Sequence, residues 1–319
     1  MYKERYLITG GSGFIGTQLI KQLLIEEHEV TVLTRDEVKT QNHFANVMTS
    51  SIRPDKTIAK VQTITDLSQL NIDNGSSFDV VINLAGQGIA DKRWTDNVKQ
   101  QLLDSRINTT NALYDYLEDV LVKPDVVISG SALGYYGLHD DDLKINESGQ
   151  GDDSFSSQLC VAWENEAKRI ENLGIRTCYL RTGIVLGKNG GALSKMLPPF
   201  KFGLGGPMGS GKQWMSWIHM EDIIGIIRYA VENESVAGAI NGTAPNPVTN
   251  KTFSSTLGQV LKRPAFIPMP AFVMKLMMGE MAEELLLSGQ RVVPEKIAKA
   301  GYQFKYSELK TALKNIIQT

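Results

Sequence analysis

The chain has 319 residues, of which 42% are hydrophobic and 21% are charged, and its net charge at pH 7 is −2. This composition is typical of a globular protein with a sizeable core, and the charge balance argues against nucleic acid or an anionic membrane as a partner. No apolar run approaches the roughly 20 residues of a membrane span, and the two cysteines, Cys160 and Cys178, lie far apart, so we expect a cytoplasmic protein without a disulfide framework.

Predicted strands and helices alternate through the first half of the chain. The run at 78–84 is almost continuously apolar, as expected of a parallel strand that is covered on both faces. Helical periodicity of apolar residues indicates the helices. The strands are expected at residues 6–9, 29–34, 57–63, 78–84, 125–129 and 176–181, and the helices at 18–26, 95–117 and 162–173. Repeated βα units predict an α/β fold with a doubly wound parallel sheet of the Rossmann type.

The second part of the chain, after about residue 187, is interrupted repeatedly by glycine and proline. We expect residues 1–187 to form a dinucleotide-binding domain, to which residues 215–245 return. Residues 188–214 and 246–319 are expected to form a smaller, loop-rich C-terminal lobe on the substrate side.

Several stretches of this second part carry their own expectations. A strand at 216–220 and a helix at 222–231 are predicted to rejoin the main sheet. Methionine and leucine at helical spacing in 270–287 predict core packing rather than an apolar substrate wall. The glycine-rich run 203–211 lacks the preceding strand and the lysine–hydroxyl pair of a nucleotide phosphate loop. We predict a flexible loop over the substrate cleft, with Lys212 as an anion contact.

The segment Thr9-Gly10-Gly11-Ser12-Gly13-Phe14-Ile15-Gly16 follows the first predicted strand and leads into the first predicted helix. In this context Gly10 permits a tight turn, Gly13 lets the backbone approach phosphates and Gly16 lets the helix pack close to the strand. The helix N-terminus offers free N–H groups to an anion. The motif predicts a bound dinucleotide, with every residue of the segment except Gly11 as a cofactor-binding candidate.

The end of the second predicted strand, Leu33-Thr34-Arg35-Asp36, bears on the choice of cofactor. A carboxylate here hydrogen-bonds the ribose 2′-hydroxyl of NAD, whereas a nearby arginine accepts the 2′-phosphate of NADP. Thr34 takes the usual acidic place, and the planar guanidinium of Arg35 suits a phosphate dianion. We expect NADP(H). NAD is the alternative, if Arg35 is only solvated and Asp36 binds the ribose.

Two later strand ends add cofactor candidates. Asn83-Leu84-Ala85-Gly86 closes the fourth predicted strand, where small residues let a cofactor lie flat across the sheet. Leu84, Ala85 and Gly86 are therefore expected to contact it. Ser129 ends the next predicted strand and is expected on the cofactor side as well.

These motifs resemble the extended short-chain dehydrogenase/reductase superfamily, which includes nucleotide-sugar epimerases and dehydratases. Further blocks resemble, more narrowly, the epimerase-family proteins that end in a small domain of unknown function. The resemblance covers essentially the whole chain and implies the fold, but it does not imply one particular reaction. It is carried by residues 9–16, 83–86, 105–108, 128–131, 180–181 and 217–222, and more narrowly by 134–137, 202–214, 263–264, 279–280, 288–292 and 301–304.

The catalytic helix departs from that superfamily, whose machinery is a tyrosine followed four residues later by a lysine that lowers the tyrosine pKa. Aligned on Glu164, the tyrosine position falls near Ser156 and the lysine position near Cys160. A serine cannot replace the tyrosine as the acid/base, and a neutral thiol cannot replace the lysine that lowers the tyrosine pKa. We expect Cys160 to be a buried inert thiol rather than a redox nucleophile. Tyr135 and Tyr136 lie upstream, but each lacks a lysine four residues on.

Two interpretations of the catalytic site stand. In the first, Ser131 donates to a substrate oxygen, Tyr135 or Tyr136 carries the proton, and His219 or Lys212 assists electrostatically. In the second, Ser131 and its neighbouring glycines form the loop on the nicotinamide side, and the tyrosines only pack.

Two arginines are also candidates. Arg106 lies on a mostly apolar helix and either binds an anionic group of the cofactor or substrate or pairs with Asp104 or Glu164. Arg181 ends a strand at the carboxyl edge, where ligands bind in open α/β sheets, so we expect it on the substrate side. The four histidines are scattered and show no metal-binding spacing, so no metal is expected.

Three functional hypotheses follow. The first is an NADP(H)-dependent, epimerase-like oxidoreductase of atypical mechanism, acting on a small polar or sugar-derived molecule. The second is a catalytically silent NADP(H)-binding sensor or partner protein. The third, a conventional NAD-dependent nucleotide-sugar epimerase, requires a tyrosine–lysine element that the sequence lacks. No nucleic-acid or membrane partner is expected, and a homodimer is possible.

Overall fold

A computed structural model describes residues 3–49, 61–70, 78–139 and 141–318. Part of the strand expected at 57–63 lies outside these ranges. Seven parallel strands form the main sheet, in the spatial order β11-β7-β5-β4-β1-β2-β3. Their bounds are β1 Arg5–Thr9, β2 Glu29–Leu33, β3 Gln62–Ile64, β4 Val80–Asn83, β5 Val126–Ala132, β7 Arg176–Thr182 and β11 Gly238–Gly242. The predicted doubly wound parallel sheet is confirmed.

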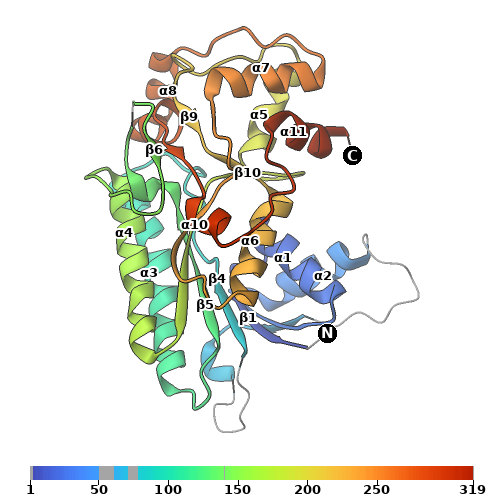
Figure 1. Cartoon of the computed structure of the whole chain (residues 1–319), viewed down its shortest axis with the longest axis vertical. Helices are drawn as coiled ribbons and strands as arrows, with labels where there is room; N and C mark the ends of the chain where they lie inside the picture. The colour runs from blue at the N-terminus through green and yellow to red at the C-terminus, as the bar shows by residue number, and fades with distance from the viewer. Residues whose placement is uncertain (1–2, 50–60, 71–77, 140, 319) are drawn as a thin grey trace.

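Helices cover both faces of this sheet (Figure 1). α1 (Phe14–Ile25), α2 (Glu37–Thr49) and α6 (Met220–Glu232) lie on one face, and α3 (Asp96–Asp119) and α4 (Phe155–Lys168) lie on the other. Successive residues of β1 show why the strands are apolar throughout. Ile8 packs into the core under α1 and α6, whereas Leu7 packs into the core under α3. Two-sided burial therefore explains the continuous apolar runs.

Two expectations about this sheet were wrong in detail. β10 (Trp217–His219) does not join it but pairs with β8 (Ile184–Leu186) in a separate two-stranded sheet. The chain returns to the main sheet at β11, which pairs with β7. α4 begins at Phe155, seven residues before the predicted start at 162, and continues as the 3₁₀ helix η3 (Arg169–Leu173).

The smaller lobe lies beyond the carboxyl ends of the strands, at the upper end of Figure 1. Its core packs α7 against α5 and α11, around Trp217 and Phe253. In α8 only Met274 is buried, while Phe272, Leu276 and Met277 are exposed, so the expectation of core packing at 270–287 was wrong for this helix. The remaining elements are η1 Leu67–Gln69, η2 Leu133–Tyr136, β6 Lys144–Ile145, α5 Gly191–Lys201, β9 Trp214–Met215, β12 Val248–Thr249, α7 Asn250–Leu261, α8 Ala271–Met278, α9 Glu280–Ala282, η4 Glu283–Leu287, β13 Arg291–Val292, α10 Glu295–Lys299 and α11 Leu309–Gln318.

Within the described ranges, no helix combines the length and the hydropathy that crossing a membrane would require.

Candidate cofactor and active site

The turn between β1 and α1 is built for close backbone contact. Gly10 has φ +67°, and a Cβ there would lie 2.4 Å from the carbonyl oxygen of Leu84. A Cβ on Gly16 would lie 2.5 Å from the Gly10 oxygen. Only glycine fits either position. The turn therefore packs directly on the Leu84-Ala85-Gly86 segment that follows β4, which brings these two groups of predicted cofactor residues together.

The N-terminus of α1 is open to a ligand. Its N-cap is Gly13, which has no side-chain cap, and its first turn holds no acidic residue. Ser12 and Gly13 are exposed, while Phe14 and Ile15 are half-buried. Because the first N–H groups of a helix have no intrahelical partner, they are available here to an anion such as a diphosphate.

A buried polar network supports the floor of this site. Thr9 Oγ1 donates to Asn83 Oδ1 at 2.6 Å and accepts the Ala85 N–H at 3.2 Å. Asn83 Nδ2 donates to Thr110 Oγ1 at 2.9 Å, and Thr110 in turn donates to the Arg106 carbonyl at 2.8 Å. The side chain of Thr9 thus fixes the ends of β1 and β4 relative to α3.

Of the residues that follow β2, Asp36 binds the next helix and Arg35 faces solvent. Asp36 Oδ1 accepts the Lys39 N–H at 2.9 Å and so caps α2. Arg35 is exposed and has no ion-pair partner among the described residues. Thr34 Oγ1 lies 2.7 Å from Thr40 Oγ1. The carboxylate is therefore engaged by the helix, whereas the guanidinium is free to meet a phosphate.

Arg106 is a buried cation. It forms no ion pair with any acidic residue in the described ranges. Its guanidinium donates to the carbonyl oxygens of Leu102 at 2.8 Å and Gln87 at 3.1 Å, and it lies 5.0 Å from the Trp163 ring centroid. A Cβ on Gly86 would lie 3.1 Å from its central carbon. Burial lowers its pKa. The guanidinium thus lies directly against Gly86, in the segment that is expected to contact the cofactor.

Of the two alternatives for Arg106, the pairing with Asp104 or Glu164 does not occur, because both carboxylates are engaged elsewhere. Asp104 accepts from Gln100 at 2.8 Å, and Glu164 binds Arg181. Since burying a charge costs free energy unless it is paired, an anionic ligand is the natural complement to Arg106.

Two buried polar atoms, one on β5 and one on α4, lack a partner among the described residues. They are Ser129 Oγ and Trp163 Nε1. The Trp163 ring lies against Gly130, next to Ser129 in β5, where a Cβ would lie 2.8 Å from it. Buried polar groups are nearly always hydrogen-bonded, so these atoms fit a site that is completed by a bound molecule.

A second buried network joins the ends of β5 and β7 to α4. Arg181 donates from Nε and Nη2 to the two carboxylate oxygens of Glu164, both at 2.8 Å. Ser131 Oγ donates to Glu164 Oε1 at 2.6 Å. Arg181 Nη1 donates to the Tyr136 hydroxyl at 3.0 Å, and that hydroxyl donates to Asn241 Oδ1 at 2.6 Å. Burial alone would lower the pKa of Arg181, but the bonds to Glu164 raise it above its ordinary value.

The structure separates the two candidate tyrosines. Tyr136 is buried and fully hydrogen-bonded, and burial raises its pKa to about 12, so it is a poor proton carrier near neutral pH. Tyr135 is half-buried, and its ring lies face-on to Arg181, whose central carbon is 3.4 Å from the ring centroid. Its hydroxyl has no partner among the described residues. Tyr135 therefore keeps a hydroxyl that a ligand can reach.

The start of α4, where the usual tyrosine and lysine would lie, is occupied differently. The N–H groups of Phe155 and Ser156 donate to the two carboxylate oxygens of Glu284 in η4, at 3.1 and 2.8 Å. Cys160 is buried, and burial raises its pKa to about 11, which agrees with an inert thiol. Glu284 was missed from the sequence, because its 128-residue separation from Ser156 leaves no local signal.

The predicted assistants lie apart from this network. His219 caps α6 through Nδ1, which accepts the Glu221 N–H at 3.1 Å, and its Nε2 lies 3.1 Å from Asn315 Oδ1. Burial lowers its pKa, so it is neutral at pH 7. Lys212 is exposed. The run 203–211 is held by main-chain hydrogen bonds to Ile267 and Met269 rather than lying free over a cleft.

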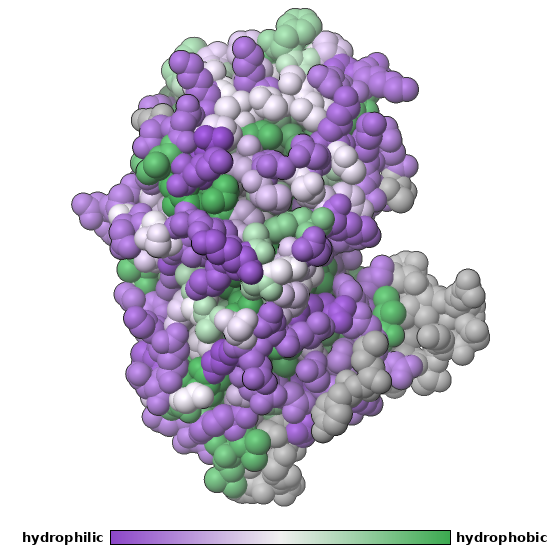
Figure 2. Space-filling model, in the orientation of Figure 1, coloured by the Kyte–Doolittle hydropathy of each residue, from purple (hydrophilic) through white to green (hydrophobic). Residues whose placement is uncertain are grey.

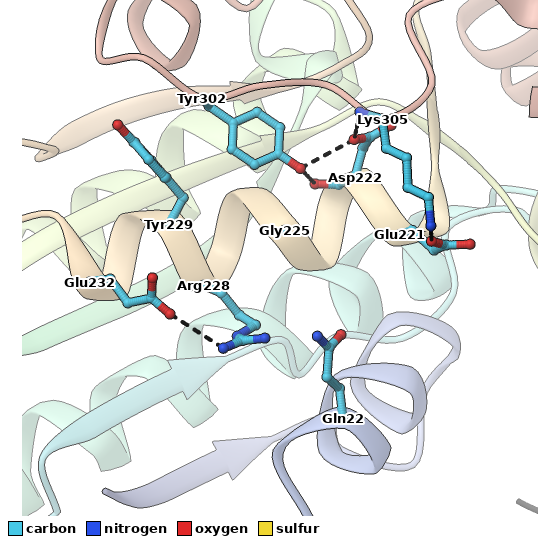
Figure 3. A pocket seen from close by; sticks show the side chains of 9 residues that line it. All are labelled: Gln22, Glu221, Asp222, Gly225, Arg228, Tyr229, Glu232, Tyr302 and Lys305. Carbon is cyan, nitrogen blue, oxygen red and sulfur yellow. Dashed lines mark hydrogen bonds and ion pairs between the residues drawn. The ribbon is translucent and has the colours of Figure 1, made fainter. Parts of the chain in front are cut away.

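A hollow of about 350 Å³ lies elsewhere, on α6 between α1 and the segment around Tyr302 (Figure 3). Its charged side chains pair with one another, as in Lys305 with Glu221 and Arg228 with Glu232. Asp222 accepts the Lys305 N–H at 2.7 Å and so anchors that segment. We therefore interpret this hollow as a structural junction. No cluster of three metal-ligating side chains occurs in the described ranges.

Comparisons with known proteins agree with this geometry. The model of the NAD dependent epimerase/dehydratase family matches residues 6–241, and that of a domain of unknown function (DUF1731) matches residues 269–316. The epimerase family protein YfhF of Bacillus subtilis is 38% identical over 313 residues, which are 97% of each chain. An Arabidopsis thaliana protein, the chloroplastic homolog of epimerase family protein SDR39U1, is 38% identical over 98% of this chain and 86% of its own.

A solved structure extends the comparison. The crystal structure of human epimerase family protein SDR39U1 (isoform 2) with NADPH superposes with a TM-score of 0.84 at 36% identity, covering 98% of this chain and 99% of that one. With the glycine turn, the open end of α1 and the parallel sheet described above, these matches place the chain in the NAD dependent epimerase/dehydratase family, in the group whose members end in the DUF1731 domain.

Proposed function

We propose that the protein is an NADP(H)-dependent, epimerase-like oxidoreductase of atypical mechanism that acts on a small polar or sugar-derived molecule. The observation that carries the choice of cofactor is the division after β2, where Asp36 caps a helix and Arg35 is free. The human relative that was solved with NADPH supports the same choice. The residues of the glycine turn and Leu84-Ala85-Gly86 would hold the diphosphate and the adjoining ribose, with Arg106 beneath them.

A bound nicotinamide would supply or accept a hydride. Tyr135 is the group we assign to the proton, since its hydroxyl is unengaged and its ring is held by Arg181. Ser131 donates its hydroxyl hydrogen to Glu164, so the expectation that it donates to a substrate oxygen was wrong. Its oxygen can instead accept a hydrogen bond from a substrate hydroxyl group. Lys212 and the surrounding lobe, residues 188–214 and 246–319, are the proposed substrate side.

Calorimetric titration with NADPH and NADH, followed by a screen of carbonyl and sugar substrates with bound NADPH, tests this function. Tighter binding of NADPH and its oxidation by one substrate class are expected. Tighter binding of NADH, or no turnover across the screen, would contradict it.

A catalytically silent NADP(H) sensor is the second candidate. It is favoured by one observation, that Ser156 and the neutral thiol of Cys160 stand at the usual tyrosine and lysine positions. That hypothesis expects tight NADPH binding without oxidation by any substrate. The conventional NAD-dependent nucleotide-sugar epimerase finds no tyrosine–lysine element on α4.

A further inference from the structure

The far end of the C-terminal lobe carries a group of exposed apolar residues, which we call the apolar tip. Main-chain hydrogen bonds hold its two loops side by side, from Ile267 to Gly205 at 3.2 Å and from Met269 to Pro207 at 2.9 Å. Figure 2 shows apolar residues at this upper end of the molecule, where the loop between α7 and α8 runs in Figure 1. The tip consists of Phe202 (80% exposed), Leu204, Phe266 (74%), Ile267, Met269, Phe272 (72%), Leu276 (76%) and Met277.

The backbone of the tip is also suited to an apolar environment. Ile267 and Met269 donate their N–H groups to the neighbouring loop. Pro268 and Pro270, which alternate with them, have no N–H to donate. Residues 267–270 therefore expose no unpaired backbone donor. Covering them with hydrocarbon would leave no unsatisfied N–H group, which removes one part of the cost of placing a loop in lipid.

The stretches of sequence that form the tip are poor in acidic residues. The sequence has no acidic residue in 172–220 or in 235–279. Four exposed basic residues, Lys201, Lys262, Arg263 and Lys275, flank the apolar side chains in sequence, and of these Lys275 pairs with Glu283. The net charge of −2 averages this basic end with an acidic remainder. The expectation that an anionic membrane is excluded rested on that average.

We propose that the apolar tip docks peripherally on an anionic phospholipid surface. Exposed aromatic and aliphatic side chains bordered by lysine and arginine are the chemistry of interfacial membrane binding, where the apolar groups enter the headgroup boundary and the cations meet lipid phosphates. A second copy of the chain fits less well. A two-fold contact would set the same basic residues against one another.

Co-sedimentation with vesicles tests the proposal. The full-length protein is expected to bind vesicles of phosphatidylcholine and phosphatidylglycerol, to release them as salt rises, and to bind phosphatidylcholine alone far more weakly. The double variant Phe266→Ser/Phe272→Ser should bind at least about tenfold more weakly, since each ring loses its apolar burial. Its matched control, Leu121→Ser/Val122→Ser, changes two exposed apolar residues on the loop after α3 and should bind like the wild type.

The basic flank is tested separately. Lys201→Gln and Lys262→Gln should each weaken vesicle binding about fivefold. The control Lys168→Gln, at an exposed lysine on α4, should leave binding unchanged. Circular dichroism and NADPH titration show whether every variant is folded. The proposal is overturned if the wild type ignores anionic vesicles at low salt or if the double variant binds them normally. It is overturned equally if light scattering reveals a dimer that Phe266→Ser/Phe272→Ser dissociates.

Discussion

Replacing Arg35 by alanine isolates the contact that we assign to the 2′-phosphate. The side chain is exposed and unpaired among the described residues, so its loss should change the free energy of unfolding by no more than about 0.5 kcal/mol. A hydrogen bond to a charged group contributes about 1.5–3 kcal/mol, and the exposure of Arg35 favours the lower end. A loss of about 1.5 kcal/mol raises the Kd for NADPH roughly tenfold.

Isothermal titration calorimetry with both reduced cofactors measures this effect. Arg35→Ala should weaken NADPH binding and leave NADH binding unchanged, because NADH has no 2′-phosphate. Arg35→Lys should recover part of the loss, since it keeps the charge without the planar fork. The exposed Lys39 on α2 provides the control, and Lys39→Ala should leave both affinities as they are. Equal weakening of the two cofactors by Arg35→Ala, or no weakening at all, would refute the assignment.

Three further predictions concern the buried network and α4. Glu164→Leu leaves Arg181 buried without its partner and should cost about 3–5 kcal/mol in urea unfolding; an unchanged midpoint would show that the pair is dispensable. Tyr135→Phe should abolish turnover at unchanged stability, while Tyr136→Phe should lower stability by about 1 kcal/mol and keep turnover; the reverse pattern would exchange their roles. Because burial raises the Cys160 pKa from 9.0 to about 11, its contribution to stability should be complete below pH 9 and be lost as the pH rises toward 11, and Cys160→Ala should flatten that decline.

The parts of the fold that the sequence predicted are those with local causes. β4 was recognised because burial on both faces demands a continuous apolar run, and the glycine turn because its spacing reflects steric limits within a few residues. β11 was missed because it is short and begins and ends with glycine, which gives it little apolar pattern. Apolar periodicity placed the start of α4 at 162, because serine and glutamine, which are typical of caps and loops, fill its first turn. The family resemblance had already placed Ser156 and Cys160 on this helix.

Long-range pairing limited the prediction of the site. The packing of α3, α4 and β7 decides whether Arg106 or Arg181 forms the ion pair with Glu164. No local sequence pattern encodes that choice. The distinction between Tyr135 and Tyr136 rests on burial against Asn241, 105 residues away from the second tyrosine. Two adjacent tyrosines can thus differ in burial and hydrogen bonding, and only the tertiary structure shows which of them is buried.

The carboxylate of Glu284 and the short pairing of β13 with β6 have a practical consequence for how this chain can be divided. The DUF1731 match begins at residue 269. Residues after that point nevertheless cap the N-terminus of α4, through Glu284, and pair with β6, through β13. A truncation at residue 269 would therefore remove the cap of α4 and the partner strand of β6. The two parts should be expressed and engineered together.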